Sequence, residues 1–108
     1  MANIFKNQYT DLGTSNSDVV DAISSGTGIV LTLRCTNVDG SSAATVTVEV
    51  VDGSSGDAKI ASTMTVPADS SIELAGTSKI VLETGDKIQA LASASGDIEV
   101  FASYLNIT

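Results

Sequence analysis

Four carboxylates in the second half of the chain are the side chains whose types could do chemistry: Glu73, Glu83, Asp86 and Glu99. Two of them could act as acid and base in glycoside hydrolysis, which needs a pair of carboxyl groups. No aromatic platform for a sugar accompanies them, because the four aromatic residues lie near the two ends of the chain. Histidine is absent, which excludes Ser-His-Asp and Cys-His catalysis and zinc sites built on histidine. We therefore expect no catalytic residue and no enzyme.

An acidic loop at residues 52–57, Asp-Gly-Ser-Ser-Gly-Asp, could attract Ca²⁺ through its carboxylates and hydroxyls. It lacks the alternating acids and the terminal Glu of a calcium-binding loop. It is not a phosphate loop either, because the Lys-Ser/Thr pair and the following helix are missing and its acids would repel phosphate. We interpret it as a turn, and expect no metal and no cofactor.

Cys35 is the single cysteine, so no disulfide can form within the chain. It stands at an alternating position after Leu33, which is typical of a strand. We expect a small buried apolar side chain there and not a reactive thiol.

The four aromatic residues form two pairs, Phe5 and Tyr9 near one end and Phe101 and Tyr104 near the other. They would form one patch if the first and last strands are neighbours. Two interpretations stay open. They fill a core made otherwise of small side chains, or they anchor a protein interface, where Tyr and Phe are enriched.

The formal net charge of −8 opposes approach to phosphate backbones and anionic lipids. We therefore expect neither a nucleic-acid nor a membrane partner. The first residues lack the apolar run of a signal peptide, and no stretch approaches the roughly 18 apolar residues of a membrane span. The sequence favours a chain made and used in solution.

Strands must position these residues, since apolar and polar residues alternate in most of the chain. Ile29, Leu31, Leu33 and Cys35 share one face of a predicted strand, and Val46, Val48 and Val50 one face of the next. Between them Asp39-Gly40 can supply the positive φ of a tight turn. The pattern predicts a hairpin over about 28–51.

Further strands are predicted at 60–66, 71–74, 79–82, 87–92 and 97–107. In 60–66 the expected inward set is Ile60, Ser62, Met64 and Val66. In 97–107 the set Ile98, Val100, Ala102 and Tyr104 faces one way, and because Leu105 and Ile107 are out of phase with it, we expect a bulge near Ser103 or Tyr104.

About eight short strands separated by turns indicate an all-β fold, an antiparallel two-sheet β-sandwich or jelly roll. We expect residues 26–108 to form this domain. Residues 1–25 are expected to be an N-terminal segment that serves as an assembly arm or an edge strand. Within it, 3–12 could form a strand that adds to a neighbour, and 19–23 a strand or a single helical turn.

Three stretches, at 66–74, 79–90 and 97–105, together resemble small structural proteins of tailed bacteriophages, in which a Leu-Glu-x-Gly-Asp turn leads into a strand of small residues. Here that turn is Leu82 to Asp86, and 31–37 with 46–50 are similar to the preceding hairpin of those proteins. The resemblance covers about 28–108.

What the resemblance implies is a virion component used in many copies, with no catalytic residues. The expected role is a capsid decoration or cement protein, a homo-oligomer that binds other virion proteins, the major capsid protein first. It would be made in the host cytoplasm and located in the virion. The alternatives are a tail, collar or fibre-associated virion protein, and a carbohydrate-binding adhesin module.

Overall fold

The computed structural model describes residues 2–76 and 78–108, which form nine strands in two antiparallel sheets. The all-β, two-sheet sandwich expected from the alternating pattern is thereby confirmed. The strands are β1 (Asn3–Asp11), β2 (Ser17–Val20), β3 (Thr27–Asn37), β4 (Ala44–Asp52), β5 (Gly56–Val66), β6 (Ser71–Glu73), β7 (Ile80–Leu82), β8 (Lys87–Ala92) and β9 (Ile98–Ile107).

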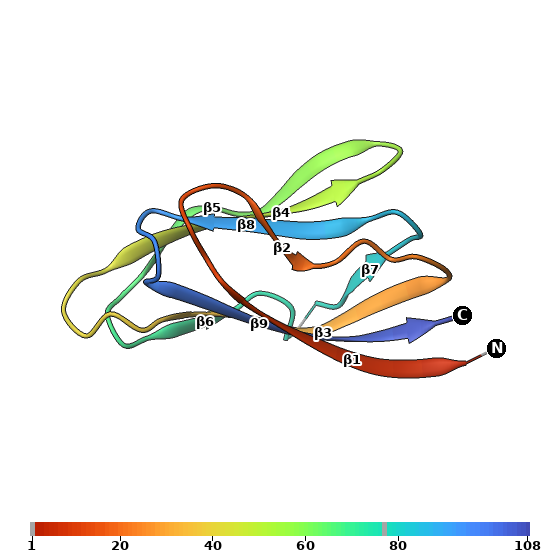
Figure 1. The fold of residues 1–108 in the computed structure, drawn as a ribbon, viewed down its shortest axis with the longest axis horizontal. Helices are drawn as coiled ribbons and strands as arrows, with labels where there is room; N and C mark the ends of the chain where they lie inside the picture. The colour runs from red at the N-terminus through yellow and green to blue at the C-terminus, as the bar shows by residue number, and fades with distance from the viewer. Residues whose placement is uncertain (1, 77) are drawn as a thin grey trace.

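The two sheets form two layers, with the chain termini side by side at one end (Figure 1). The five-stranded sheet, here sheet A, has the order β1-β9-β3, and both β6 and β7 pair with the far side of β3. The four-stranded sheet, sheet B, has the order β2-β8-β4-β5. The core lies between the layers and consists mainly of Val, Ile, Leu and Ala. No helix among the described residues is long and apolar enough to cross a membrane.

The hairpin predicted over 28–51 is wrong, because β3 and β4 lie in different sheets. The buried side chains of both strands contribute to the core between the sheets, and the strands do not pair with each other. The connection between the sheets is held by Asn37, which is fully buried at the end of β3. Its side-chain amide donates to the carbonyl oxygens of Ser42 at 3.0 Å and Val66 at 2.9 Å.

The bulge predicted near Ser103 or Tyr104 lies on the neighbouring strand instead. β9 alternates between inward and outward residues along its whole length, with Asn106 buried as the last inward side chain. The register shifts on β3, where Val30 pairs with Tyr104 but Thr32 pairs with Ser103, so Leu31 is the extra residue. Leu105 is therefore an apolar side chain on the outer face of the sheet and not a sign of a phase change.

The inward set predicted for 60–66 is also wrong in part. Ala61 is buried and Met64 is 41% exposed. Two register shifts against β4, on either side of Val48, change which residues of β5 face the core. Thr63, which adopts a positive φ of 49°, lies at the first of these shifts. Bulges of this kind reverse the phase of a strand without leaving a clear sequence signal.

Residues 2–25 belong to the edges of the sandwich. β1 pairs with β9 over its nine residues, and β2 pairs with β8. Leu12, Val19 and Val20 are part of the core. The short β2 covers only one half of β1, where Gln8 and Thr10 donate side-chain hydrogen bonds to the carbonyl oxygen of Asp18.

Candidate docking surface

The outer face of sheet A carries a row of apolar side chains at the end near the chain termini. Val81 pairs with Ile29, Ile29 with Leu105, and Leu105 with Phe5. Residues directly opposite each other in antiparallel strands point to the same side of the sheet, so these four side chains form one line, here called the apolar row. Phe5 is 73% exposed and Val81 61% exposed.

A second row crosses the same face farther from the termini. Tyr9 pairs with Phe101, and Phe101 pairs with Arg34. Tyr9 donates a hydrogen bond to Glu99 at 3.4 Å. The pKa of Tyr9 is raised, first by desolvation and then by the nearby carboxylates of Glu99 and Asp11. This aromatic row is polar at its ends and apolar in its middle.

Between the two rows lies a shallow groove of about 250 Å³. Its lining residues are Phe5, Lys6, Asn7, Leu31, Phe101, Ser103 and Tyr104. The groove exists because the small side chains of Asn7 and Ser103 face each other between the larger ones of the rows.

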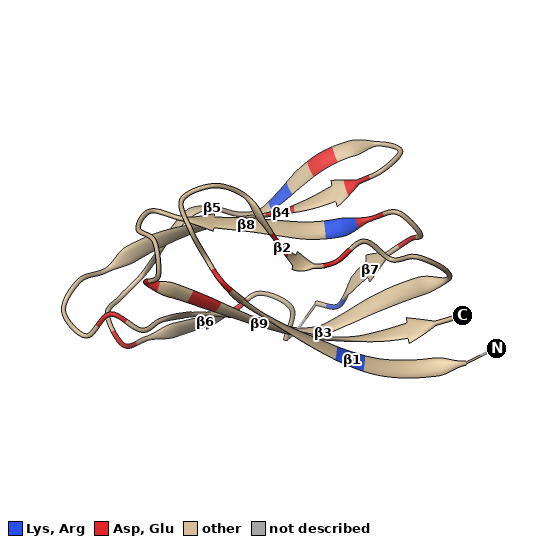
Figure 2. Cartoon of the chain, in the orientation of Figure 1, with Lys and Arg blue, Asp and Glu red and all other residues tan. Residues whose placement is uncertain are grey.

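The terminal half of sheet A is free of acids in a chain that carries thirteen of them. Residues 2–8, 27–33, 80–82 and 100–107 contain Lys6 but no Asp or Glu. Figure 2 shows β1, β3 and β9 tan toward the termini except for that lysine, whereas the acids lie in the loops at both ends and along sheet B. A partner could therefore cover this end of sheet A without burying a negative charge.

The structure brings three of the four expected interface aromatics together on this face: Phe5, Tyr9 and Phe101. Tyr104 is instead buried, with 8% exposure, and points into the core beneath the groove. Burial raises its pKa, and Asp21 adds to the shift. Each interpretation of the aromatics thus describes part of the set, and a role in an interface stays a prediction.

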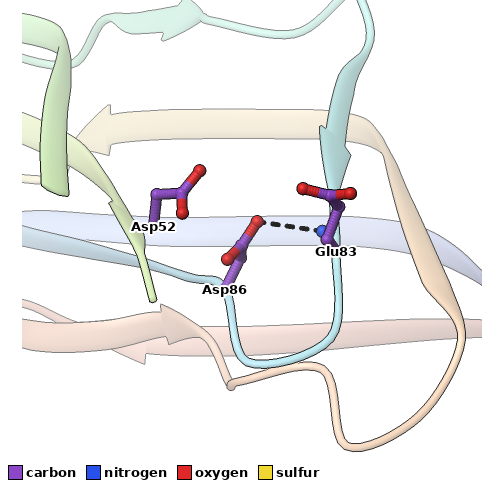
Figure 3. A group of neighbouring side chains, drawn as sticks. All are labelled: Asp52, Glu83 and Asp86. Carbon is purple, nitrogen blue, oxygen red and sulfur yellow. Dashed lines mark hydrogen bonds between the residues drawn. The ribbon is translucent and has the colours of Figure 1, made fainter. Parts of the chain in front are cut away.

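The acids considered for chemistry mostly hold backbone groups. The carboxylate oxygens of Asp52, Glu83 and Asp86 come within 4.8 Å of one another (Figure 3). Asp86 accepts hydrogen bonds from the backbone N–H groups of Gly53 at 3.1 Å and Glu83 at 3.0 Å. Asp52 accepts from the backbone and hydroxyl of Ser54 and the backbone of Ser55, which lowers its pKa. Both carboxylates therefore act as turn clamps.

The other two carboxylates lie on sheet A and do not join that cluster. Glu73 accepts hydrogen bonds from the backbone N–H groups of Leu33 at 2.7 Å and Ala75 at 3.1 Å. It also contacts Arg34, with 3.7 Å between the charged atoms. Glu99 is held by Tyr9.

Substituting Asp86 by Ala is expected to destabilise the fold by about 1–3 kcal/mol, because two backbone N–H groups lose their acceptor. Chemical denaturation of the isolated domain measures this loss. Asp57→Ala is the matched control, since it removes an exposed acid at the start of β5, next to the same turn. Equal midpoints for the two variants would show that Asp86 is not a clamp.

Cys35 is fully buried, as expected, and burial with a smaller contribution from Glu73 raises its pKa to about 12. The thiolate is the reactive form, so we expect the native thiol to stay unmodified by a water-soluble thiol reagent at about pH 8 and to react once the chain is denatured. A Ser62→Cys variant supplies an exposed thiol as the positive control. Modification of native Cys35 as fast as Cys in that variant would contradict its burial.

No protein-family model and no curated protein matches the chain. Among solved structures, it is similar to a chain of the Bacillus endospore appendages, described as a novel family of disulfide-linked pili. The TM-score is 0.53 at 15% identity, over 97% of this chain and 86% of that one. A pentameric capsid protein isolated from metagenomic phage sequences gives a TM-score of 0.47 at 18% identity, over 93% of this chain and 59% of that one. At these identities the likeness to the appendage chain concerns the fold.

Proposed function

We propose that this chain is a non-enzymatic structural protein of a tailed-phage virion, a decoration or cement protein that binds the head lattice in many copies. The single observation that carries the proposal is the exposed outer face of sheet A, with its apolar and aromatic rows. The four most exposed apolar side chains of these rows present on the order of 400–500 Å² of surface, taking an aromatic side chain as about 150–250 Å². These side chains are Phe5, Tyr9, Val81 and Phe101. The largest apolar patch on a typical monomer measures about 300–600 Å² and is often functional, so a patch of this size fits an interaction site.

Charge supports the same face. The strand segments that form the terminal half of sheet A contain no acid, although Asp21 and Glu83 border them, so docking on their outer face covers no carboxylate of those segments. The acidic surface then faces outward, away from the packaged DNA of a phage head, whose phosphates would repel it.

Many weak contacts of this kind become strong when a lattice repeats them. Copies that also associate with one another would act as a multivalent unit, in which each contact need supply only part of the affinity. The major capsid protein is the expected partner, because it offers the most repeated surface of a virion.

Such an assembly would be held by non-covalent contacts. The similar appendage chain belongs to disulfide-linked pili. Here the single cysteine is buried in the core, where it cannot reach another chain while the sandwich stays folded.

A tail, collar or fibre-associated virion protein is the alternative within this class, since the same face could bind those structures. The groove favours a second candidate of another class, a carbohydrate-binding adhesin module. Phe5 and Phe101 line it, with Asn7 and Ser103 between them as polar groups able to bind hydroxyls. Its volume of about 250 Å³ is below the roughly 300–1,000 Å³ of typical ligand sites, which favours the protein partner.

The experiment is to strip the protein from purified particles and to add it back. Stripped heads are expected to lose their DNA at a lower temperature than native ones. When salt is reduced, they should lose it at a higher salt concentration than native ones, because weaker screening raises the repulsion between packaged phosphates. The added protein should restore both limits. Heads that are equally robust with and without the protein would refute the cement role. Glycan-array binding by the isolated domain would favour the adhesin instead.

A further inference from the structure

Within residues 2–76 and 78–108, no strand pairs with the outer edge of β1. Ala2 and Thr108 exchange both backbone hydrogen bonds, and the N–H of Leu12 bonds the carbonyl of Ile98 at 2.9 Å. Because hydrogen-bonded and non-hydrogen-bonded positions alternate in an antiparallel pair, the even-numbered residues of β1 bond to β9. The odd-numbered residues direct their N–H and C=O groups away from β9. These residues are Asn3, Phe5, Asn7, Tyr9 and Asp11.

The other sheet edges in residues 2–76 and 78–108 each carry a feature that discourages pairing with another chain. β2 has four residues and an irregular register, and β6 and β7 have three residues each. β5 has two register shifts and a residue with positive φ, Thr63. β1 has nine residues in unbroken register and no proline. A long, regular, exposed edge is a template for strand addition.

We propose that β1 pairs antiparallel with β1 of a second copy of this chain, about a two-fold axis at Asn7. In this register Phe5 lies opposite the second copy's Tyr9, and Asn3 opposite the second copy's Asp11. All five residues of the open edge then become hydrogen-bonded positions, which gives about ten backbone hydrogen bonds.

Charge complementarity indicates that the strand added to the open edge of β1 comes from a second copy of this chain. β1 carries one base and one acid, Lys6 and Asp11, so two strands can meet without net repulsion in a chain of net charge −8. The register places Lys6 opposite the second copy's Gln8. Within each copy the side-chain N–H of Gln8 donates to the carboxylate of Asp21 at 3.1 Å, and the backbone N–H of Asp21 donates to the side-chain oxygen of Gln8 at 3.0 Å. Lys6 thus approaches the second copy's Asp21. The two-fold axis produces this Lys6–Asp21 pair once on each side of the dimer.

The aromatic side chains fit the same register. Phe5 ends the apolar row, and Tyr9 ends the aromatic row. Pairing of the two strands brings Phe5 of each copy beside the second copy's Tyr9 on the outer face, a cross-strand aromatic pair that stabilises sheets. The apolar row of one copy then continues into the aromatic row of the other.

This inference goes beyond the proposed function, because it concerns the edge of sheet A and not the partner that covers its face. The outer faces of two copies would become one continuous surface. If the dimer fails to form, docking of single copies on a lattice stays possible, and a dimer that binds no particle leaves the pairing intact.

Asn7→Pro is the decisive variant. The N–H of Asn7 points to the open edge, so proline removes a donor at the two-fold axis without removing a bond to β9. Asn7→Ala is the matched control, because it keeps the donor and removes only the side chain. We expect sedimentation equilibrium to give twice the monomer mass for the wild type and for Asn7→Ala, and the monomer mass for Asn7→Pro. The proposal is overturned if Asn7→Pro is still a dimer. It is also overturned if the wild type is a monomer at about 1 mM, a concentration at which even a dimer with a Kd of about 1 mM would be detected.

Amide hydrogen exchange of the wild type tests the pairing without any variant. The amides of Phe5, Asn7 and Tyr9 should be protected at high protein concentration and should lose that protection on dilution. Those of Lys6 and Gln8 should stay protected throughout, because they bond to β9. A dimer in which the amides of Phe5, Asn7 and Tyr9 exchange freely overturns the proposal.

The charge pair gives an independent test. Lys6→Glu should weaken the dimer several-fold, since each of two exposed pairs contributes a small amount of free energy. Combining it with Asp21→Lys should restore the affinity, because the attraction is re-formed with opposite signs. If the double variant dimerises no more tightly than Lys6→Glu alone, the proposed register of β1 against β1 of the second copy is wrong.

Discussion

Val81→Asp combined with Phe101→Asp is expected to abolish binding of the chain to its assembly while the sandwich stays folded. The two residues lie in different rows of the outer face of sheet A and are 61% and 45% exposed. Covering an unpaired carboxylate with apolar surface costs several kcal/mol, and each 1.4 kcal/mol is a tenfold change in Kd. We therefore expect at least a hundredfold, on the order of 3 kcal/mol, loss of affinity.

Co-sedimentation with stripped particles measures this loss, and circular dichroism confirms the fold. Ser62→Asp combined with Thr65→Asp is the matched control, since it adds the same charge to exposed positions of β5 on the other sheet. Phe101 lies beside Tyr9 of β1, but neither substitution changes a backbone group of β1, so self-association through that strand should persist. Unchanged particle binding by Val81→Asp with Phe101→Asp would show that another surface docks.

Asn37→Ala is expected to cause the largest loss of stability among the polar substitutions, about 2–4 kcal/mol. Asn37 is fully buried, and its amide satisfies the carbonyl oxygens of Ser42 and Val66 where the chain crosses between the sheets. Its side-chain oxygen also accepts from the N–H of Asp39 at 2.9 Å. Alanine leaves these groups without a partner in the interior.

Thermal unfolding should show the midpoint of Asn37→Ala lowered by roughly 10 °C or more, because about 1 kcal/mol shifts a domain of this size by about 4–8 °C. Asp39→Ala is the control. It removes the exposed hydrogen bonds from Ser41 to the Asp39 carboxylate but keeps the backbone N–H that donates to the side-chain oxygen of Asn37. It should lower the midpoint by only a few degrees, in line with the usual effect of a surface substitution. Equal shifts for both variants would contradict the role of Asn37.

Alternation along single strands predicted the buried face of β9, but that of β3 only in part. Leu33 and Cys35 are buried as expected, whereas the bulge at Leu31 leaves Ile29 and Leu31 outside the core. The inward set Ile98, Val100, Ala102 and Tyr104 lies in the core as the pattern of β9 indicated. The pattern does not show which strand lies beside which. It therefore predicted a hairpin between β3 and β4, which lie in different sheets.

The candidate docking surface was predictable only in part for the same reason. The sequence placed aromatic residues near both ends, and the pairing of β1 with β9 brings Phe5, Tyr9 and Phe101 onto one face. Tyr104 and Phe101 lie an odd number of residues apart on β9, so the alternation of the strand places their side chains on opposite faces of the sheet. Val81 and Ile29 joined the surface through non-local pairing, for which a single strand carries no signal.

The most direct test of the proposed decoration role is the amount of this chain in purified tailed-phage particles whose genome carries its gene, measured by quantitative mass spectrometry against the major capsid protein. A head decoration protein should be present in a fixed ratio to the major capsid protein, comparable to the number of lattice sites, and it should be lost only when the heads are stripped. Absence from the particles, or a few copies as in a collar or baseplate, would contradict the account.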